Sequence, residues 1–124
     1  MSKIVIALGG NALGKTPSEQ LSILEGVSKV IVDLIEKGNK VILTHGNGPQ
    51  VGQISLAMEY ASNGSAATPS MPFAECGSMS EGYIGYHIEQ SIMNELNKRD
   101  IDKSIVALIT EVLVDKNDGC FKNP

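Results

Sequence analysis

The feature that most constrains the fold is a short apolar run near the N-terminus that stops abruptly on glycine. Residues 4–8 read Ile-Val-Ile-Ala-Leu, and residues 9–11 read Gly-Gly-Asn. A continuous apolar run of this length, rich in branched residues, is typical of a strand buried on both faces of a parallel sheet. Residues 40–44 form a second such run, and they also lead into a glycine-asparagine turn, at 45–52. The chain thus places two similar turns directly after two predicted strands.

The segment between the two runs predicts a helix with a well-defined start. Thr16 is a candidate N-cap, Pro17 suits the first helical position, and Glu19 completes a capping box. Apolar residues follow at helical spacing as far as Ile35, and Gly38 is a candidate for the C-terminal cap. A strand, a helix and a second strand in this order predict a right-handed crossover with parallel strands.

The rest of the chain extends this α/β pattern. A helix is expected to begin near Pro49, and residues 62–72 read as a surface connection because they are small, polar and interrupted by proline. Residues 78–81 predict another capping box, ahead of a third helix carrying apolar residues from 84 to 96. Residues 104–115 are rich in β-branched side chains and predict a third strand. The expected fold class is therefore α/β with a mainly parallel sheet.

Composition excludes several function classes. The chain has 124 residues, 42% of them hydrophobic, which suits one domain. A net charge of −4 provides no basic stripe for nucleic acid, and no apolar segment approaches the length of a membrane span. Cys76 and Cys120 lie far apart and form no C-x-x-C pair, so a reduced, cytoplasmic protein without a metal centre is expected. Because no closing element follows the last predicted strand, we expect the chain to be the front part of a larger fold.

One alternative is a P-loop nucleotide hydrolase. Residues 9–16 satisfy the G-x-x-x-x-G-K-[ST] pattern, in which backbone N–H groups and the lysine hold phosphates and the hydroxyl holds magnesium. A helix that begins at Pro17 argues against it, because Thr16 would then use its hydroxyl to cap that helix. The alternative stays open at this point.

The second interpretation takes the two glycine-asparagine turns together. Ligands of open α/β sheets bind outside the carboxyl ends of the strands, and glycine turns let amide groups approach an anion closely. A single turn of this kind most often binds nothing. Two such turns at neighbouring strand ends favour an anion site between them.

Four stretches carry a resemblance to a known family: VIALGGNAL, VILTHGNGPQVG, MPFAECGSMSEGYIGY and EVLVDKNDGCFKNP. In this order, over nearly the whole chain, they resemble the carbamate kinases of the amino acid kinase family. The resemblance implies a three-layer α/β/α sandwich and reversible phosphoryl transfer between ATP and carbamate, as in arginine fermentation. It also implies a homodimer, carbamate or carbamoyl phosphate as ligand, and magnesium carried by the ATP or ADP.

The resemblance further implies roles for individual residues. The transferring phosphoryl group would be held by Gly9, Gly10 and Asn11. The carbamate pocket would be lined by Gly46, Asn47 and Gly48 and shaped by Pro49 and Gln50. Chains of the family are much longer, so residues 1–124 would be the N-terminal, acceptor-binding part of one domain. The nucleotide-binding residues are expected beyond Pro124, and by itself the chain could be a non-catalytic fragment.

Overall fold

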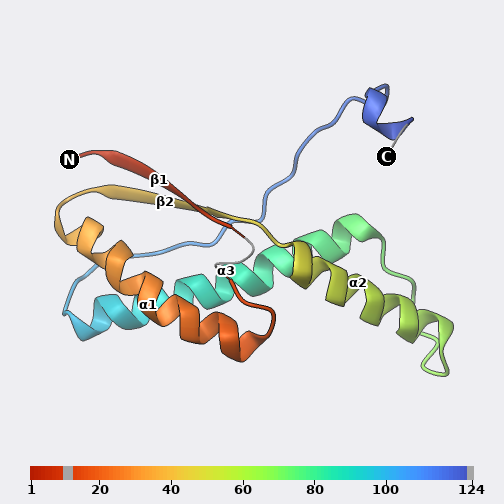
Figure 1. The fold of residues 1–124 in the computed structure, drawn as a ribbon, viewed down its shortest axis with the longest axis horizontal. Helices are drawn as coiled ribbons and strands as arrows, with labels where there is room; N and C mark the ends of the chain where they lie inside the picture. The colour runs from red at the N-terminus through yellow and green to blue at the C-terminus, as the bar shows by residue number, and fades with distance from the viewer. Residues whose placement is uncertain (10–12, 123–124) are drawn as a thin grey trace.

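The computed structural model describes residues 1–9 and 13–122, so the predicted site residues Gly10 and Asn11 lie outside the described residues. The elements follow in the order β1 (Lys3–Leu8), α1 (Pro17–Glu36), β2 (Lys40–His45), α2 (Gly48–Asn63) and α3 (Phe73–Lys98). A short 3-10 turn, η2 (Gly119–Phe121), lies near the C-terminus. Figure 1 shows the two strands on one side of the molecule and the helices α1 and α3 across from them.

The first strand, helix and second strand form the predicted β-α-β unit. β1 and β2 pair in parallel, in a register that runs from Lys3 opposite Lys40 to Leu8 opposite His45. Both strands therefore end at the same edge of the sheet. The prediction of an α/β fold with a parallel sheet is confirmed.

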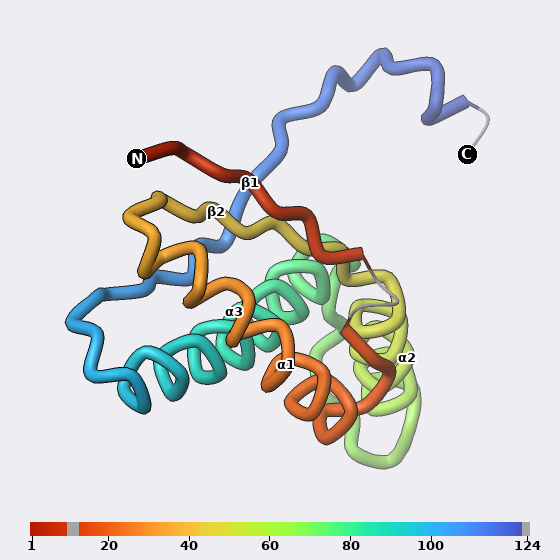
Figure 2. Tube along the Cα trace, turned by 60° about the vertical axis from the view of Figure 1, so that its left-hand side comes forward, coloured from red at the N-terminus to blue at the C-terminus, as the bar shows by residue number. Residues whose placement is uncertain are grey.

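The core lies between one face of this sheet and the helices α1 and α3, which run side by side in both views (Figures 1 and 2). Each helix presents one apolar stripe to the core, as the helical spacing predicts. The buried members of the core cluster are Leu8, Leu13, Leu24, Ile31, Val32, Ile84, Ile88, Ile92 and Leu96.

The prediction that β1 is buried on both faces is wrong. Side chains of β1 and β2 alternate between the helical face and an open face, where Val5 is 65% exposed and Ile42 is 51% exposed. The reason is that α1 and α3 pack on the same face, so the described residues supply the sheet and one helical layer.

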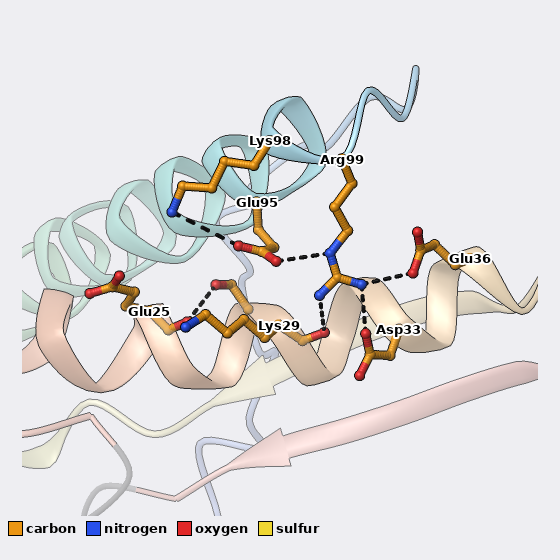
Figure 3. Close-up of polar contacts among 8 residues, drawn as sticks. Glu25, Lys29, Asp33, Glu36, Glu95, Lys98 and Arg99 are labelled. Atoms are coloured by element: carbon orange, nitrogen blue, oxygen red, sulfur yellow. Dashed lines mark hydrogen bonds and ion pairs between the residues drawn. The ribbon is translucent and has the colours of Figure 1, made fainter.

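An ion-pair cluster joins the C-terminal ends of α1 and α3 (Figure 3). Arg99 Nη1 lies 2.6 Å from Asp33 Oδ1 and 2.7 Å from Glu36 Oε2, while Arg99 Nε donates to Glu95 Oε1 at 2.8 Å. Hydrogen bonds to Asp33 and Glu95 raise the pKa of the Arg99 guanidinium, so it stays charged. One side chain thus fixes the spacing of the two helices at this end.

The predicted capping box at residues 78–81 is wrong. α3 begins at Phe73, and Ser78 lies inside the helix with its hydroxyl donating to the Glu75 carbonyl at 2.8 Å. The S-x-x-E spacing is local and occurs equally well in a helix interior, where serine can hydrogen-bond backward along the same helix.

The predicted third strand at residues 104–115 is also wrong, because the segment has no strand ladder in the described structure. Its first part crosses α3, where a Cβ added to Gly85 would lie 3.0 Å from Ala107 Cβ. Farther on, the Glu81 carboxylate accepts from the Thr110 amide at 2.8 Å. β-Branched composition favours a strand only where a partner strand completes the hydrogen bonds.

Across the described ranges, no helix combines the length and apolar character needed to cross a membrane.

Candidate functional site

The two glycine turns leave the sheet side by side. Leu8 and His45 are the last paired residues, and the Gly46 amide donates to the Leu8 carbonyl at 3.1 Å. Gly9 follows Leu8 directly, so the backbones at Gly9 and Gly46 are neighbours at the carboxyl edge. Because the Gly46 N–H is already bonded within the sheet, it is not available to donate a hydrogen bond to a ligand. Gly46 can still let a ligand approach the backbone closely, because it is exposed and has no side chain.

The N-terminus of α1 is closed by the chain's own side chains. Thr16 has the extended backbone of an N-cap, with φ −118 and ψ 158, and its hydroxyl accepts from the Glu19 amide. Glu19 Oε2 in turn accepts from the amides of Lys15 at 2.9 Å and Thr16 at 3.2 Å. These bonds, the one from Lys15 first, hold the pKa of the Glu19 carboxyl below its ordinary value. An internal carboxylate therefore occupies the place where an external anion would bind.

This capping arrangement is incompatible with a P-loop. The amides of Lys15 and Thr16 and the Thr16 hydroxyl are the groups that a P-loop directs at phosphates and magnesium, and here all three are engaged by Glu19. Gly14 has a positive φ of 68°, and a Cβ added there would lie 2.9 Å from Glu19 Cβ. Glycine at this position is thus explained by the turn itself. The P-loop alternative is not supported.

The N-terminus of α2, by contrast, is open. Asn47 is the N-cap residue, but its side chain makes no capping hydrogen bond, and Asn47 Nδ2 donates instead to Ser80 Oγ on α3 at 2.8 Å. The first helical bond runs from the Val51 amide to the Asn47 carbonyl. Pro49 has no N–H, and within the part of the chain that the structure describes the amides of Gly48 and Gln50 have no acceptor. An uncapped helix start carries partial positive charge and is suited to an anion.

Gln50 fastens this open helix start to the other turn. The whole residue is buried, at 2% exposure, and its Nε2 donates to the Gly14 carbonyl at 3.0 Å. Gln53 makes a second, longer contact from its Nε2 to the Lys15 carbonyl, at 3.4 Å. Within the described ranges Gln50 Oε1 is buried without a partner. The turns after β1 and β2 are therefore joined into one unit.

Sequence reasoning placed Asn47, Gly48 and Gln50 at this edge but missed Ser80. No local pattern marks that serine, since it lies 33 residues from Asn47 and meets it only through the packing of α2 on α3. His45, beside the site, has Nδ1 within 3.1 Å of the Gly46 carbonyl, as a hydrogen-bonded loop histidine would.

Two other features lie away from this edge. A hollow of about 650 Å³ runs between β2, α3 and residues 103–110, and its lining reaches His45 but includes none of residues 46–50. In the α1–α3 interface, His87 Nδ1 pairs with Gln20 Oε1 at 2.8 Å, and burial lowers the pKa of this histidine. Within residues 1–9 and 13–122, no three His, Cys, Asp or Glu side chains are grouped so as to hold a metal ion.

Comparison with known proteins gives a consistent result. A sequence model of the amino acid kinase family matches residues 2–117. The chain is 52% identical over 124 residues to a carbamate kinase of Staphylococcus haemolyticus and equally to one of Staphylococcus aureus, in each case covering 100% of this chain. Among solved structures, it resembles the carbamate kinase from Giardia lamblia bound to AMP-PNP, with a TM-score of 0.88 and 38% identity over 99% of this chain.

The coverage of those relatives is partial. The chain spans 40% of the length of the staphylococcal relatives and 44% of the Giardia chain.

Proposed function

Because the chain belongs to the amino acid kinase family, we propose that it forms the phosphoryl-acceptor side of a carbamate kinase. The reaction would be reversible transfer of the γ-phosphoryl group of ATP to carbamate, giving ADP and carbamoyl phosphate. The three similar proteins named above are carbamate kinases, and the likeness extends over essentially the whole of this chain.

The observation that carries this proposal is the contrast between the two helix starts. α1 is closed by Thr16 and Glu19, whereas the Asn47 side chain leaves the start of α2 uncapped, and among the described residues the exposed Gly48 has no acceptor for its amide. A helix start of this kind suits carbamate or the phosphoryl group of carbamoyl phosphate, both of which are anions. Gly46 and Pro49 would border the ligand, and Asn47 and Gln50 would shape its pocket.

Phosphoryl transfer to carbamate requires hydrogen-bond donors and in-line alignment of the reacting groups. Carbamate carries its own negative charge, so its oxygen can attack phosphorus without a base removing a proton first. Phosphoryl transfer through a loose transition state depends on in-line positioning and on neutralising charge on the equatorial oxygens. Backbone amides held by a packed helix provide both without reorganising during the reaction. Gly9, with Gly10 and Asn11 outside the described residues, would supply the phosphoryl side of this cradle.

The remaining parts of the proposal rest on the family. Nucleotide-binding residues would belong to the larger share of the relatives that this chain does not match, so residues 1–124 form the acceptor-binding part of one domain. Magnesium would arrive on the ATP or ADP, since phosphate oxygens are its preferred ligands. We also propose a cytoplasmic homodimer that acts in arginine metabolism. If the chain acts alone, it binds carbamoyl phosphate without turnover, as a non-catalytic fragment.

The test is an assay of ATP formed from ADP and carbamoyl phosphate, together with carbamoyl phosphate binding followed through the backbone amide resonances. In a catalytically active chain, Asn11→Ala is expected to lower turnover by about a hundredfold, the typical cost of losing one transition-state donor. Gly10→Ala keeps its backbone N–H and is expected to lower turnover because the added methyl would hinder close approach of the phosphoryl group to the backbone. Lys15→Ala is the control and should leave turnover unchanged, since Lys15 belongs only to the rejected P-loop.

If the chain shows no turnover, the proposed site is tested by carbamoyl phosphate binding. Carbamoyl phosphate should then shift the amides of Gly9, Gly48 and Gln50. The proposed site would be refuted if carbamoyl phosphate left these three amide resonances unmoved in the unmodified chain and if, among the variants, only Lys15→Ala lost binding.

A further inference from the structure

The hollow between β2 and residues 103–110 lies between two extended backbone segments. β2 pairs only with β1 among the described residues, and the whole of Lys40–His45 lines the hollow. On the other side lie residues 103–108, and within the described chain the backbone amides of 104–109 donate no hydrogen bond. An apolar small molecule would leave these backbone groups unpaired, whereas an inserted strand can pair with both segments. Apolar side chains of α1 and α3 also line the hollow, namely Ile31, Ile35, Ile88, Ile92 and Leu96.

The two segments run in the same direction along α3. The turn after β2 meets α3 through the bond from Asn47 Nδ2 to Ser80 Oγ. Residues 103–110 begin just after α3 ends and run back along it as far as Glu81, whose carboxylate accepts from the Thr110 amide. Both segments therefore arrive at the part of α3 around residues 80–81, and the chain leaves the hollow there.

Residues 111–115, with the sequence EVLVD, have the properties of a strand that could fill such a hollow. They are rich in β-branched side chains, Leu113 is 100% exposed and Val112 is 82% exposed. In Figures 1 and 2 the chain beyond Thr110 extends away from the helices. To enter the hollow of its own copy, the chain would have to reverse at Glu111 and Val112, and neither is a turn-forming residue type. A second copy could receive the segment without that reversal.

Entry into a second copy at this end would make the segment antiparallel to β2. In a register with Leu113 opposite Ile42, these two side chains share the open face of the sheet, where Ile42 is exposed. Val112 and Val114 then point to the other face, toward the apolar side chains of the helices. Every apolar side chain of the segment thus meets an apolar surface.

The same register is complementary in charge. It places Asp115 opposite Lys40, where β2 begins, and Lys103 also lines the hollow. A carboxylate beside these two ammonium groups is favourable, although the chain as a whole carries a net charge of −4.

We propose that residues 111–115 of one copy insert between β2 and residues 104–110 of a second copy, and that the exchange is reciprocal. A two-fold axis makes the two insertions equivalent and closes the assembly at a dimer. A two-stranded sheet is marginal by itself, and the inserted strand extends it to residues 104–110. The inference goes beyond the proposed function, which leaves the contact between subunits unspecified, and does not depend on the ligand.

The experiment measures the mass of the 124-residue chain by sedimentation between about 1 μM and 1 mM. The chain should change from monomer to dimer within this range. Val112→Pro should weaken dimerisation by about tenfold, because proline removes a backbone donor and does not fit inside a sheet. Since Val112 is exposed in the single chain, the monomer of this variant should keep the circular dichroism and stability of the unmodified chain.

A charge exchange tests the register. Asp115→Lys should weaken dimerisation by about fivefold because it places two lysines opposite each other, and adding Lys40→Asp to the same chain should restore the affinity. Glu59→Lys is the matched control, since it makes the same change of charge on α2, which does not line the hollow. This control should dimerise as the unmodified chain does.

Contacts between copies give the direct evidence. In a mixture of isotope-labelled and unlabelled chains, NMR should show contacts from the methyl groups of Val112 in one copy to those of Leu43 in the other. The same contacts within one copy would mean that the segment folds back into its own hollow and would overturn the proposal. A chain that stays monomeric, a dimer that Val112→Pro does not weaken, or a charge exchange that restores nothing would also overturn it. The proposed function is tested separately, by turnover and carbamoyl phosphate binding.

Discussion

Replacing Gly14 by alanine tests the interpretation of the glycine-rich turn as a structural turn of α1. Gly14 has a φ of +68°, and a Cβ added there would lie 2.9 Å from Glu19 Cβ and 3.2 Å from the Gln20 amide nitrogen. The left-handed conformation costs an L-residue about 1–2 kcal/mol, and forcing a methyl into a packed site costs about 1–3 kcal/mol. The neighbouring atoms include backbone, which cannot simply move aside. We therefore expect Gly14→Ala to lower the free energy of unfolding by about 2–5 kcal/mol.

The measurement is equilibrium urea denaturation, with Gly26→Ala as the matched control. Gly26 lies within α1, and a Cβ added there meets nothing within 4 Å. Alanine should therefore stabilise the helix at this position by up to about 1 kcal/mol. If Gly14→Ala is as stable as the unmodified chain, the left-handed turn and its contact with Glu19 do not exist in solution, and the argument against a P-loop loses its basis.

Three further predictions concern charged and titratable side chains. The folded state holds the pKa of Glu19 below its ordinary 4.5, so its stabilisation should be complete above that pH and be lost as the pH falls through the lower folded value. Glu19→Gln should remove that part of the acid dependence of unfolding, and identical pH profiles would contradict the capping bonds. Burial lowers the pKa of His87 below 6.5, so stability should fall as the pH drops from 6.5 toward the folded pKa, and His87→Gln should flatten this limb of the profile. At low ionic strength, Arg99→Met should lower the thermal midpoint of unfolding by less than Gly14→Ala does. This decrease should become smaller in high salt, because salt screens the ion pairs of Arg99. A decrease that does not depend on salt would mean that Arg99 stabilises the fold by packing and not by its charge.

The helix start at Thr16 could be predicted because its determinants are local. Thr16, Pro17 and Glu19 lie within four residues, and their capping bonds need nothing from the rest of the chain. The parallel pairing of β1 and β2 followed in the same way from a strand, a helix and a strand in sequence. The convergence of the two turns at one sheet edge is a consequence of that pairing.

Other predictions failed because the same local pattern has more than one outcome. Ser78 and Glu81 have the spacing of Thr16 and Glu19, but α3 had already begun at Phe73. Residues 104–115 have strand composition, but a strand also needs a partner ladder, which local composition does not provide.

The sequence by itself determined the β-α-β unit, the closed start of α1 and the presence of two glycine turns after two strands. Only the tertiary structure decided which helix start is open. Asn47 is as good a cap as Thr16 by residue type, and the difference between them is a hydrogen bond to Ser80 on another helix. Capping depends on side chains a few residues away, whereas that bond exists only because α2 packs against α3.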